Sequence, residues 1–142
     1  MKEQIKFKFN PFKKGLNRVL GTLEKDIIEV LWKFGELCVK DILEELPEGK
    51  NSSYSAVITV ANRMTEKGLL KKRKIGKAFY YKPLQSKEKF FKMISKRIVE
   101  EVSDFSPQLA MVHFVDYMEQ IGSDKIEYFS KLIESRKQKQ KS

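Results

Sequence analysis

The sequence predicts a mostly α-helical protein with one small β-hairpin, built in two parts. Three observations lead to this fold class. Apolar residues recur at helical spacing in three short segments before residue 68. A basic hairpin sequence follows, and after residue 86 apolar residues recur every three or four positions over longer segments. The predicted order is a winged helix-turn-helix domain over 20–85, with a hairpin as its wing, and then a helical dimerisation domain over 86–135.

The first two predicted helices cover residues 22–34 and 39–46. Thr22 is the expected N-terminal cap of the first, because a hydroxyl there can accept a backbone N–H. Apolar side chains then follow the i, i+4, i+7 spacing of one buried face, and Gly35 ends the helix. The second helix carries a similar apolar stripe and stops at Pro47.

The third predicted helix begins after Ser52 or Ser53 and runs to about Lys67, with Gly68 just past its end. Its apolar residues gather on one side, whereas the opposite side carries short, mostly uncharged polar side chains. A solvated helix of this chain would be rich in Lys and Glu. Ser, Thr, Asn and Arg hydrogen-bond base edges, and Ile can touch a thymine methyl. We therefore predict base readout in duplex DNA by Ser55, Ile58, Thr59, Asn62 and Arg63.

Two short strands, "LLKK" and "AFYYK", flank the tip "RKIGK". Gly76 supplies the permissive backbone that a tight hairpin needs. Five bases fall within residues 71–77 without an acid. Lysines on strands often serve only solubility or edge protection, but a cluster at a hairpin tip fits phosphate contacts beside a groove. The expected phosphate contacts are Ser53, Tyr54, Lys71, Arg73, Lys74 and Lys77.

The charge distribution supports a polyanionic partner. The chain has a net charge of +10, and residues 51–85 contribute eight bases and one acid, or +7. The single cysteine, Cys38, excludes an internal disulfide framework and a multi-cysteine metal site. Without a signal peptide or an apolar run of about 18 residues, a cytoplasmic protein is expected, with no membrane partner. We find no catalytic motif, so we expect no enzyme, no cofactor and no metal site.

Residues 1–19 form a basic N-terminal arm, since residues 1–20 carry six Lys and Arg against one acid. The segment "IKFKF" alternates with a period of two and is either a short strand or disordered. We expect the arm to add phosphate or minor-groove contacts.

The second part is predicted to hold a helix from Ser86 to about Val102, a restart at Pro107, a last helix from Ser123, and a disordered basic tail over 136–142. A helical hairpin this apolar cannot bury itself alone, so it folds back on the first domain or pairs with a second chain. The expected homodimer interface comprises Ile94, Ile98, Val102, Leu109, Val112, Val115, Met118, Phe129 and Ile133.

The aromatic residues offer an alternative partner. Tyr54, Phe79, Tyr80 and Tyr81 can stack on bases, which would favour single strands or RNA. Aromatic residues at alternate strand positions more often pack onto neighbouring helices, so RNA is the less favoured partner.

The stretch from "LGTLEKDIIEVLWKFGE" through "VKDILEEL", the serine-led third helix, "EKGLL" and "KAFYYKPL" resembles the penicillinase-repressor family of the BlaI/MecI/CopY type. Glu24, Trp32, Thr59 and Arg63 are among the matching residues. The resemblance covers residues 20–85 well and 86–135 loosely. It implies a bacterial transcriptional repressor that binds a two-fold symmetric operator as a homodimer.

The sequence departs from this family in its usual induction signals. The copper-responsive branch has a C-terminal CxC pair, which a chain with one cysteine lacks. The β-lactam branch is cleaved at an Asn–Phe bond early in its C-terminal domain, and no Asn follows Asn62. The resemblance therefore implies neither copper sensing nor induction by that cleavage. The alternative function is a winged-helix module that binds proteins, or nucleic acids without sequence preference.

Overall fold

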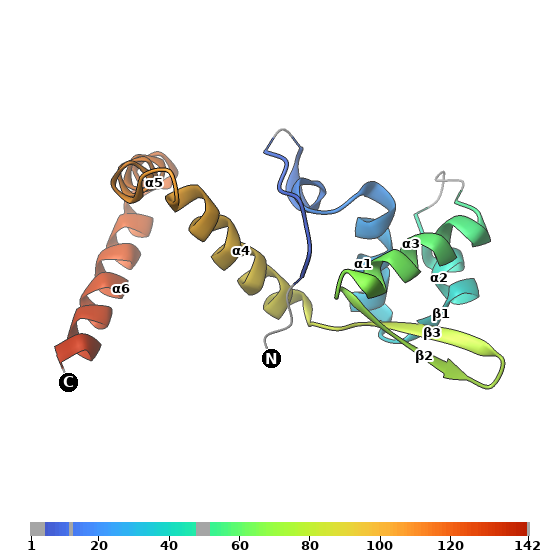
Figure 1. Cartoon of the computed structure of the whole chain (residues 1–142). Helices are drawn as coiled ribbons and strands as arrows, with labels where there is room; N and C mark the ends of the chain where they lie inside the picture. Colours follow the sequence, from blue (N-terminus) through green and yellow to red (C-terminus); the bar gives the residue numbers. More distant parts are fainter. Residues whose placement is uncertain (1–4, 12, 48–51, 142) are drawn as a thin grey trace. The chain divides into compact units, whose positions relative to one another are not determined.

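The computed structural model describes residues 5–11, 13–47 and 52–141. They fall into two compact units, residues 1–94 and 95–142, with the division inside one long helix (Figure 1). Helices dominate both units and one small antiparallel sheet lies in the first, so the predicted fold class is confirmed. Within the described residues, no helix is both long and apolar enough to cross a membrane.

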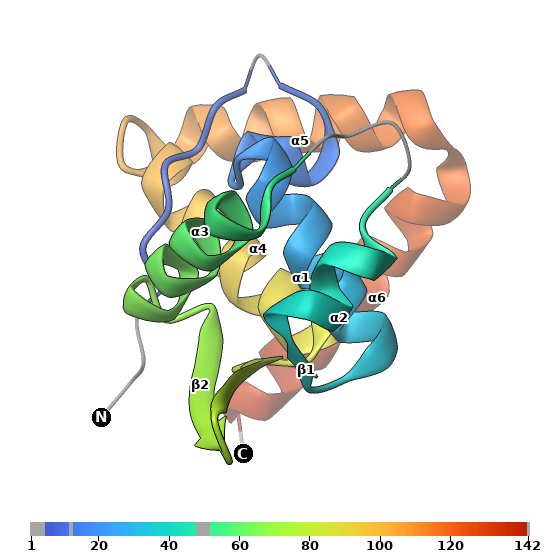
Figure 2. The same ribbon diagram turned by 90° about the vertical axis from the view of Figure 1, so that its right-hand side faces the viewer.

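The first unit contains a short 3₁₀ helix, three α-helices, three strands and the beginning of a fourth α-helix. In chain order these are η1 (Gly15–Arg18), α1 (Thr22–Phe34), β1 (Leu37–Cys38), α2 (Val39–Glu45), α3 (Tyr54–Glu66), β2 (Leu70–Ile75), β3 (Ala78–Pro83) and α4 (Lys87–Ser103). Helices α1, α2 and α3 pack against one another and against the sheet (Figure 2). Their bounds agree with the predicted helices to within one residue at most ends.

The N-terminal end of α1 is capped by a different residue from the one predicted. The capping position is Gly21 and not Thr22, which is the first helical residue. The N–H of Gly21 donates to the Glu24 carboxylate at 2.9 Å. The Lys67 ammonium binds the other oxygen of Glu24 at 2.9 Å, so this nearly buried acid also joins α1 to the end of α3. Its position near the helix N-terminus favours its negative charge.

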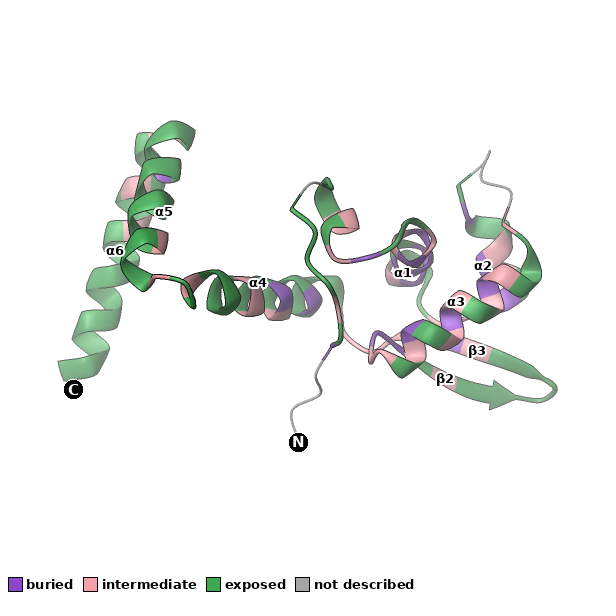
Figure 3. Ribbon diagram, turned by 45° about the horizontal axis from the view of Figure 1, so that its top comes forward, coloured by how far each residue is buried: buried purple, intermediate pink, exposed green. Residues whose placement is uncertain are grey.

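Helix α3 is held by one strictly apolar side. Val57, Ala61 and Met64 are fully buried, whereas the outer side of the helix is open to solvent (Figure 3). Ser53 caps the helix by accepting the Ala56 N–H at 3.1 Å, as predicted. The chain reverses at Gly68, whose φ of 83° is easily reached only without a side chain.

The sheet has the order β1-β3-β2 and is antiparallel throughout. The register pairs Ile75 with Ala78, which leaves a two-residue turn with Gly76 at a φ of 63°. The two hairpin strands are longer than the predicted segments. The short strand β1 was not predicted, because two residues carry no readable period.

The first turns of α4 belong to the first unit. Phe90 is fully buried, and its ring lies 5.3 Å from the ring of Trp32. The indole N–H of Trp32 donates to the carbonyl of Gln85 at 3.1 Å. Ile94 is only 6% exposed and so offers little surface to a second chain, and its place in a dimer interface stays a prediction. It follows Phe90 by four residues and therefore shares its buried face.

The second unit holds the rest of α4, then α5 (Pro107–Ile121) and α6 (Ser123–Lys141). Helices α5 and α6 pack as a hairpin, with the rings of Phe114 and Phe129 5.5 Å apart. Ser106 caps α5 with a 3.3 Å bond to the Leu109 N–H. Helix α6 continues to Lys141, whereas a disordered tail was expected from residue 136. Arg, Lys and Gln are good helix formers, so charge alone does not end the helix.

Candidate nucleic-acid interface

The exposed side of α3 carries the predicted base-reading residues. Ser55, Thr59 and Arg63 are exposed, and Ile58 and Asn62 are partly exposed. At 100° per residue they occupy one sector of the helix, opposite the buried stripe. The hairpin of β2 and β3 extends from the same side of the first unit (Figure 2). The helix and the hairpin therefore form one continuous surface, which we call the α3–hairpin surface.

The hydroxyl proton of Thr59 already takes part in a hydrogen bond within α3. Its Oγ1 donates to the Ser55 carbonyl at 2.9 Å. Two functions remain to this side chain: the hydroxyl oxygen can accept a hydrogen bond, and the methyl group can make an apolar contact. Both suit a base edge in a major groove, where amino groups donate and thymine presents a methyl.

Asn62 lies at the junction between α3 and the hairpin. Its Oδ1 accepts hydrogen bonds from the Tyr81 hydroxyl at 2.6 Å and from Lys72 Nζ at 3.0 Å. Tyr81 is 1% exposed, and burial raises the pKa of its phenol above the ordinary value. The phenol therefore stays protonated and donates at physiological pH. With its oxygen engaged, Asn62 can offer a base only its N–H donors, which suits acceptors such as guanine O6 or N7.

The two faces of the hairpin differ. Lys72 and Lys74 are two residues apart on β2, and their partners in register are Tyr81 and Phe79 on β3. The Lys72 ammonium lies 4.1 Å from the centre of the Phe79 ring, and that of Lys74 lies 5.8 Å away. Phe79 is 44% exposed. The face next to α3 therefore combines two cations with an open aromatic ring.

Lys71 and Arg73 alternate with these residues on β2 and belong to the opposite face. Arg73 pairs with Glu36: its Nε donates to both carboxylate oxygens, at 2.9 and 3.0 Å, and a terminal nitrogen donates as well. This hydrogen bonding lowers the pKa of Glu36 and raises that of Arg73. Glu36 therefore remains ionised to a lower pH than an ordinary glutamate does. A phosphate would have to compete with this carboxylate for Arg73.

Ser53, Tyr54 and the five residues predicted to read bases lie on α3 or at its cap, Lys74 lies on the hairpin face next to α3, and Lys77 occupies the hairpin turn. Sequence reasoning missed Lys72, which links the hairpin to Asn62, and Glu36, which engages Arg73. Strand alternation within "KKRK" could have put Lys72 and Lys74 on one face. No sequence signal could have identified Glu36, because its pairing depends on the unpredicted strand β1.

Three helices, a basic hairpin and a polar outer side of the third helix define a winged helix-turn-helix protein of the DNA-binding class. The chain belongs to the penicillinase repressor family, whose family model matches residues 20–135.

Three similar proteins give the following identities and coverages. The chain is 29% identical over 107 residues to "Transcriptional regulator BlaI" from Mycobacterium tuberculosis, which covers 74% of this chain and 75% of that protein. It is 21% identical over 117 residues to "Methicillin resistance regulatory protein MecI" from Staphylococcus aureus, covering 82% and 94%. The solution structure of the DNA binding domain of the repressor BlaI aligns with a TM-score of 0.43 and 24% identity, over 53% of this chain and 90% of that one.

The Asn62–Tyr81 contact gives a test of how the hairpin is attached. Tyr81→Phe should lower the free energy of unfolding by about 1 kcal/mol, because it removes a buried hydrogen bond. Tyr80→Phe, on the adjacent and more exposed residue, is the matched control and should change it by less than about 0.5 kcal/mol. Urea denaturation of both variants measures the difference. Equal losses would show that the phenol of Tyr81 does not hold the hairpin.

Proposed function

We propose that this protein is a sequence-specific, double-stranded-DNA-binding transcriptional repressor that binds a two-fold symmetric operator as a homodimer. Membership of the penicillinase repressor family supports the function class. The observation that carries the assignment to particular residues is the α3–hairpin surface, where a nearly acid-free polar helix side adjoins a basic hairpin. The proposed activity is binding and not catalysis, and its DNA partner implies a cytoplasmic site of action.

The roles within this surface follow from the hydrogen bonds that each side chain still has to offer. Ser55, Thr59 and Arg63 face outward along α3, where a helix in the major groove meets base edges. Asn62 would donate to base acceptors, and Ile58 would make an apolar contact.

The phosphate contacts would flank the bases. Ser53 and Tyr54 lie at the N-terminal end of α3, where the helix dipole favours anions. Lys74 and Lys77 supply cations from the hairpin, and Lys71 lies on its outer face. Arg73 would join them after exchanging Glu36 for a phosphate.

The second unit supports the homodimer. The second unit has many apolar residues but buries few of them. Met118 is the only fully buried apolar side chain among its described residues, and Phe105 is 96% exposed. Val102, Leu109, Val112, Val115 and Ile133 of the expected interface are exposed as well. Ile98 and Phe129 are partly exposed. Large apolar surfaces of this kind mark a protein interface, and a self-complementary helical face gives a closed dimer.

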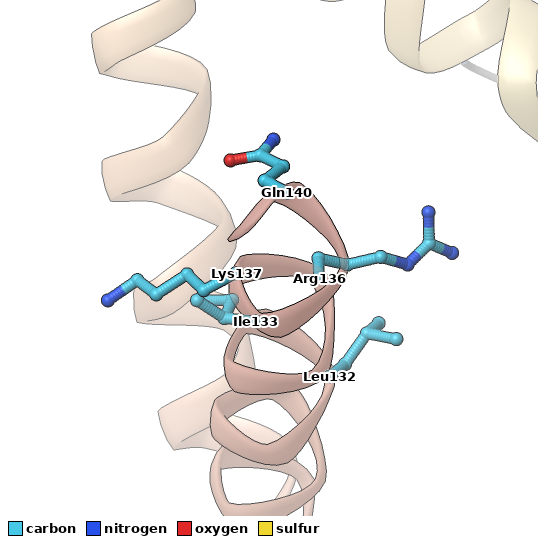
Figure 4. A pocket seen from close by; sticks show the side chains of 5 residues that line it. All are labelled: Leu132, Ile133, Arg136, Lys137 and Gln140. Atoms are coloured by element: carbon cyan, nitrogen blue, oxygen red, sulfur yellow. The ribbon is translucent and has the colours of Figure 1, made fainter. Parts of the chain in front are cut away.

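The surface of α6 is consistent with the proposed homodimer. Leu132 and Ile133 line a shallow pocket together with Arg136, Lys137 and Gln140 (Figure 4). All five side chains come from one helix, so the pocket lacks an opposite wall within its own unit. We propose that side chains of a second copy complete it.

Base readout is tested by two threonines on the same helix. Thr59→Ala should weaken binding to the cognate operator by about 1–3 kcal/mol and binding to random duplex DNA very little. Thr65→Ala is the matched control, because Thr65 makes the same intrahelical bond, to the Ala61 carbonyl at 2.9 Å, and is partly buried near the C-terminal end of α3. Lys74→Ala should weaken both DNAs alike and reduce the slope of log K against log salt by about 0.9. Equal effects of Thr59→Ala on both DNAs would contradict base readout by this residue.

Dimerisation is tested by placing a charge on the exposed side of α5. Val112→Asp should convert the dimer to a chain of 16.7 kDa in sedimentation equilibrium, since a carboxylate would be buried at the interface. Gln120→Asp on the same helix introduces the same group at an exposed polar position and should leave the dimer intact. A wild-type protein that sediments at 16.7 kDa would contradict the homodimer.

A further inference from the structure

The basic arm is attached to the C-terminal end of α3. Ile5 is 4% exposed. The N–H of Lys6 donates to the carbonyl of Lys67, the C-terminal capping residue of α3, at 3.2 Å. A second backbone bond, from the Asn10 N–H to the Arg18 carbonyl at 2.6 Å, joins the two halves of the arm. Figures 1 and 2 both show the arm beside this end of α3. Residues 5–11 follow their path without regular secondary structure, so the short strand expected as one of the two alternatives is not formed.

The alternation within "IKFKF" has a structural meaning. Ile5 is buried and Phe7 is partly buried, whereas Lys6 and Lys8 are exposed. In an extended segment, successive side chains point to opposite sides. The two apolar residues therefore fasten the arm to the first unit, and the two lysines face solvent at the end of α3.

This end of α3 is otherwise a poor place for a phosphate. The C-terminal end of a helix carries partial negative charge. The exposed acid Glu66 lies there and offsets Arg63, which is in the same last turn. The ammonium of Lys67 is held 2.9 Å from Glu24 and is thereby largely neutralised. Cations for a phosphate at this end have to come from another segment, and the arm supplies two.

We propose that Lys6 and Lys8 form a phosphate-binding site for duplex DNA at the C-terminal end of α3, beyond the contacts of the helix and the hairpin. The site rests on the proposed DNA-binding function. The family match begins at residue 20, so the arm adds this site to a surface that the family model describes without it. The arm lengthens the contact along the DNA backbone and adds affinity that does not depend on base sequence.

The salt dependence of binding tests this site. Lys6→Gln with Lys8→Gln keeps both apolar anchors and should reduce the slope of log K against log salt by about 1.8, or 0.9 for each lost phosphate contact. The loss should be equal for cognate and random duplexes. Lys6→Arg with Lys8→Arg should restore the slope. Lys139→Gln with Lys141→Gln removes the same charge from the last turn of α6 and should leave the slope unchanged.

The outcomes separate this proposal from the function on which it rests. If the wild-type protein and the double-glutamine arm variant bound duplex DNA with the same slope of log K against log salt, the proposed arm site would be wrong. The proposed DNA-binding function would be unaffected by that result. If the α6 control lowered the slope by the same amount, the effect would come from net charge alone, and the proposed arm site would again be wrong. A wild-type protein without salt-dependent duplex binding would overturn both proposals. Thermal melting of each variant checks that substitution of these exposed side chains leaves the fold intact.

Discussion

The hydrogen bond from the buried Tyr81 hydroxyl to Asn62 is the contact on which the α3–hairpin surface depends. Tyr81 lies on the central strand of the sheet, paired with Leu37 on one side and Lys72 on the other. Its burial fixes the sheet, and its hydroxyl fixes the sheet to the outer side of α3. Helix and hairpin are thereby one preorganised surface, so the proposed binding to DNA would not have to order them first. The same bond has a chemical consequence, because it leaves Asn62 as a donor only.

The chain separates its charges and apolar groups according to their tasks. Residues 21–50 carry four bases and eight acids, and they supply the acids that hold the domain together, Glu24 on Lys67 and Glu36 on Arg73. Residues 51–85 carry the excess of bases that a polyanion requires. The second unit is nearly balanced in charge and exposes apolar side chains instead. The two units thus present different chemistry: one suits phosphate and bases, and the other suits a second copy of the chain.

Much of this fold could be predicted from sequence, since α1 and α3 have strong periods and clear ends at Gly35 and Gly68. The exposed sector of α3 that we propose to read bases also follows from its period. Contacts between distant segments could not be predicted: the pairing of Glu36 with Arg73 depends on the two-residue strand β1. The burial of Ile94 could not be predicted either, because its spacing fits both a dimer stripe and the continuation of the buried Phe90 face.

We propose that a preorganised α3–hairpin surface, presented twice by a homodimer, reads a two-fold symmetric DNA sequence. The most direct measurement is selection of bound duplexes from a randomised library by the purified full-length protein, at about 150 mM salt, where phosphate contacts alone are weak. We expect recovery of one motif with two inverted half-sites, separated centre to centre by about one helical turn or a multiple of it. Retention of duplexes without any shared motif would contradict it.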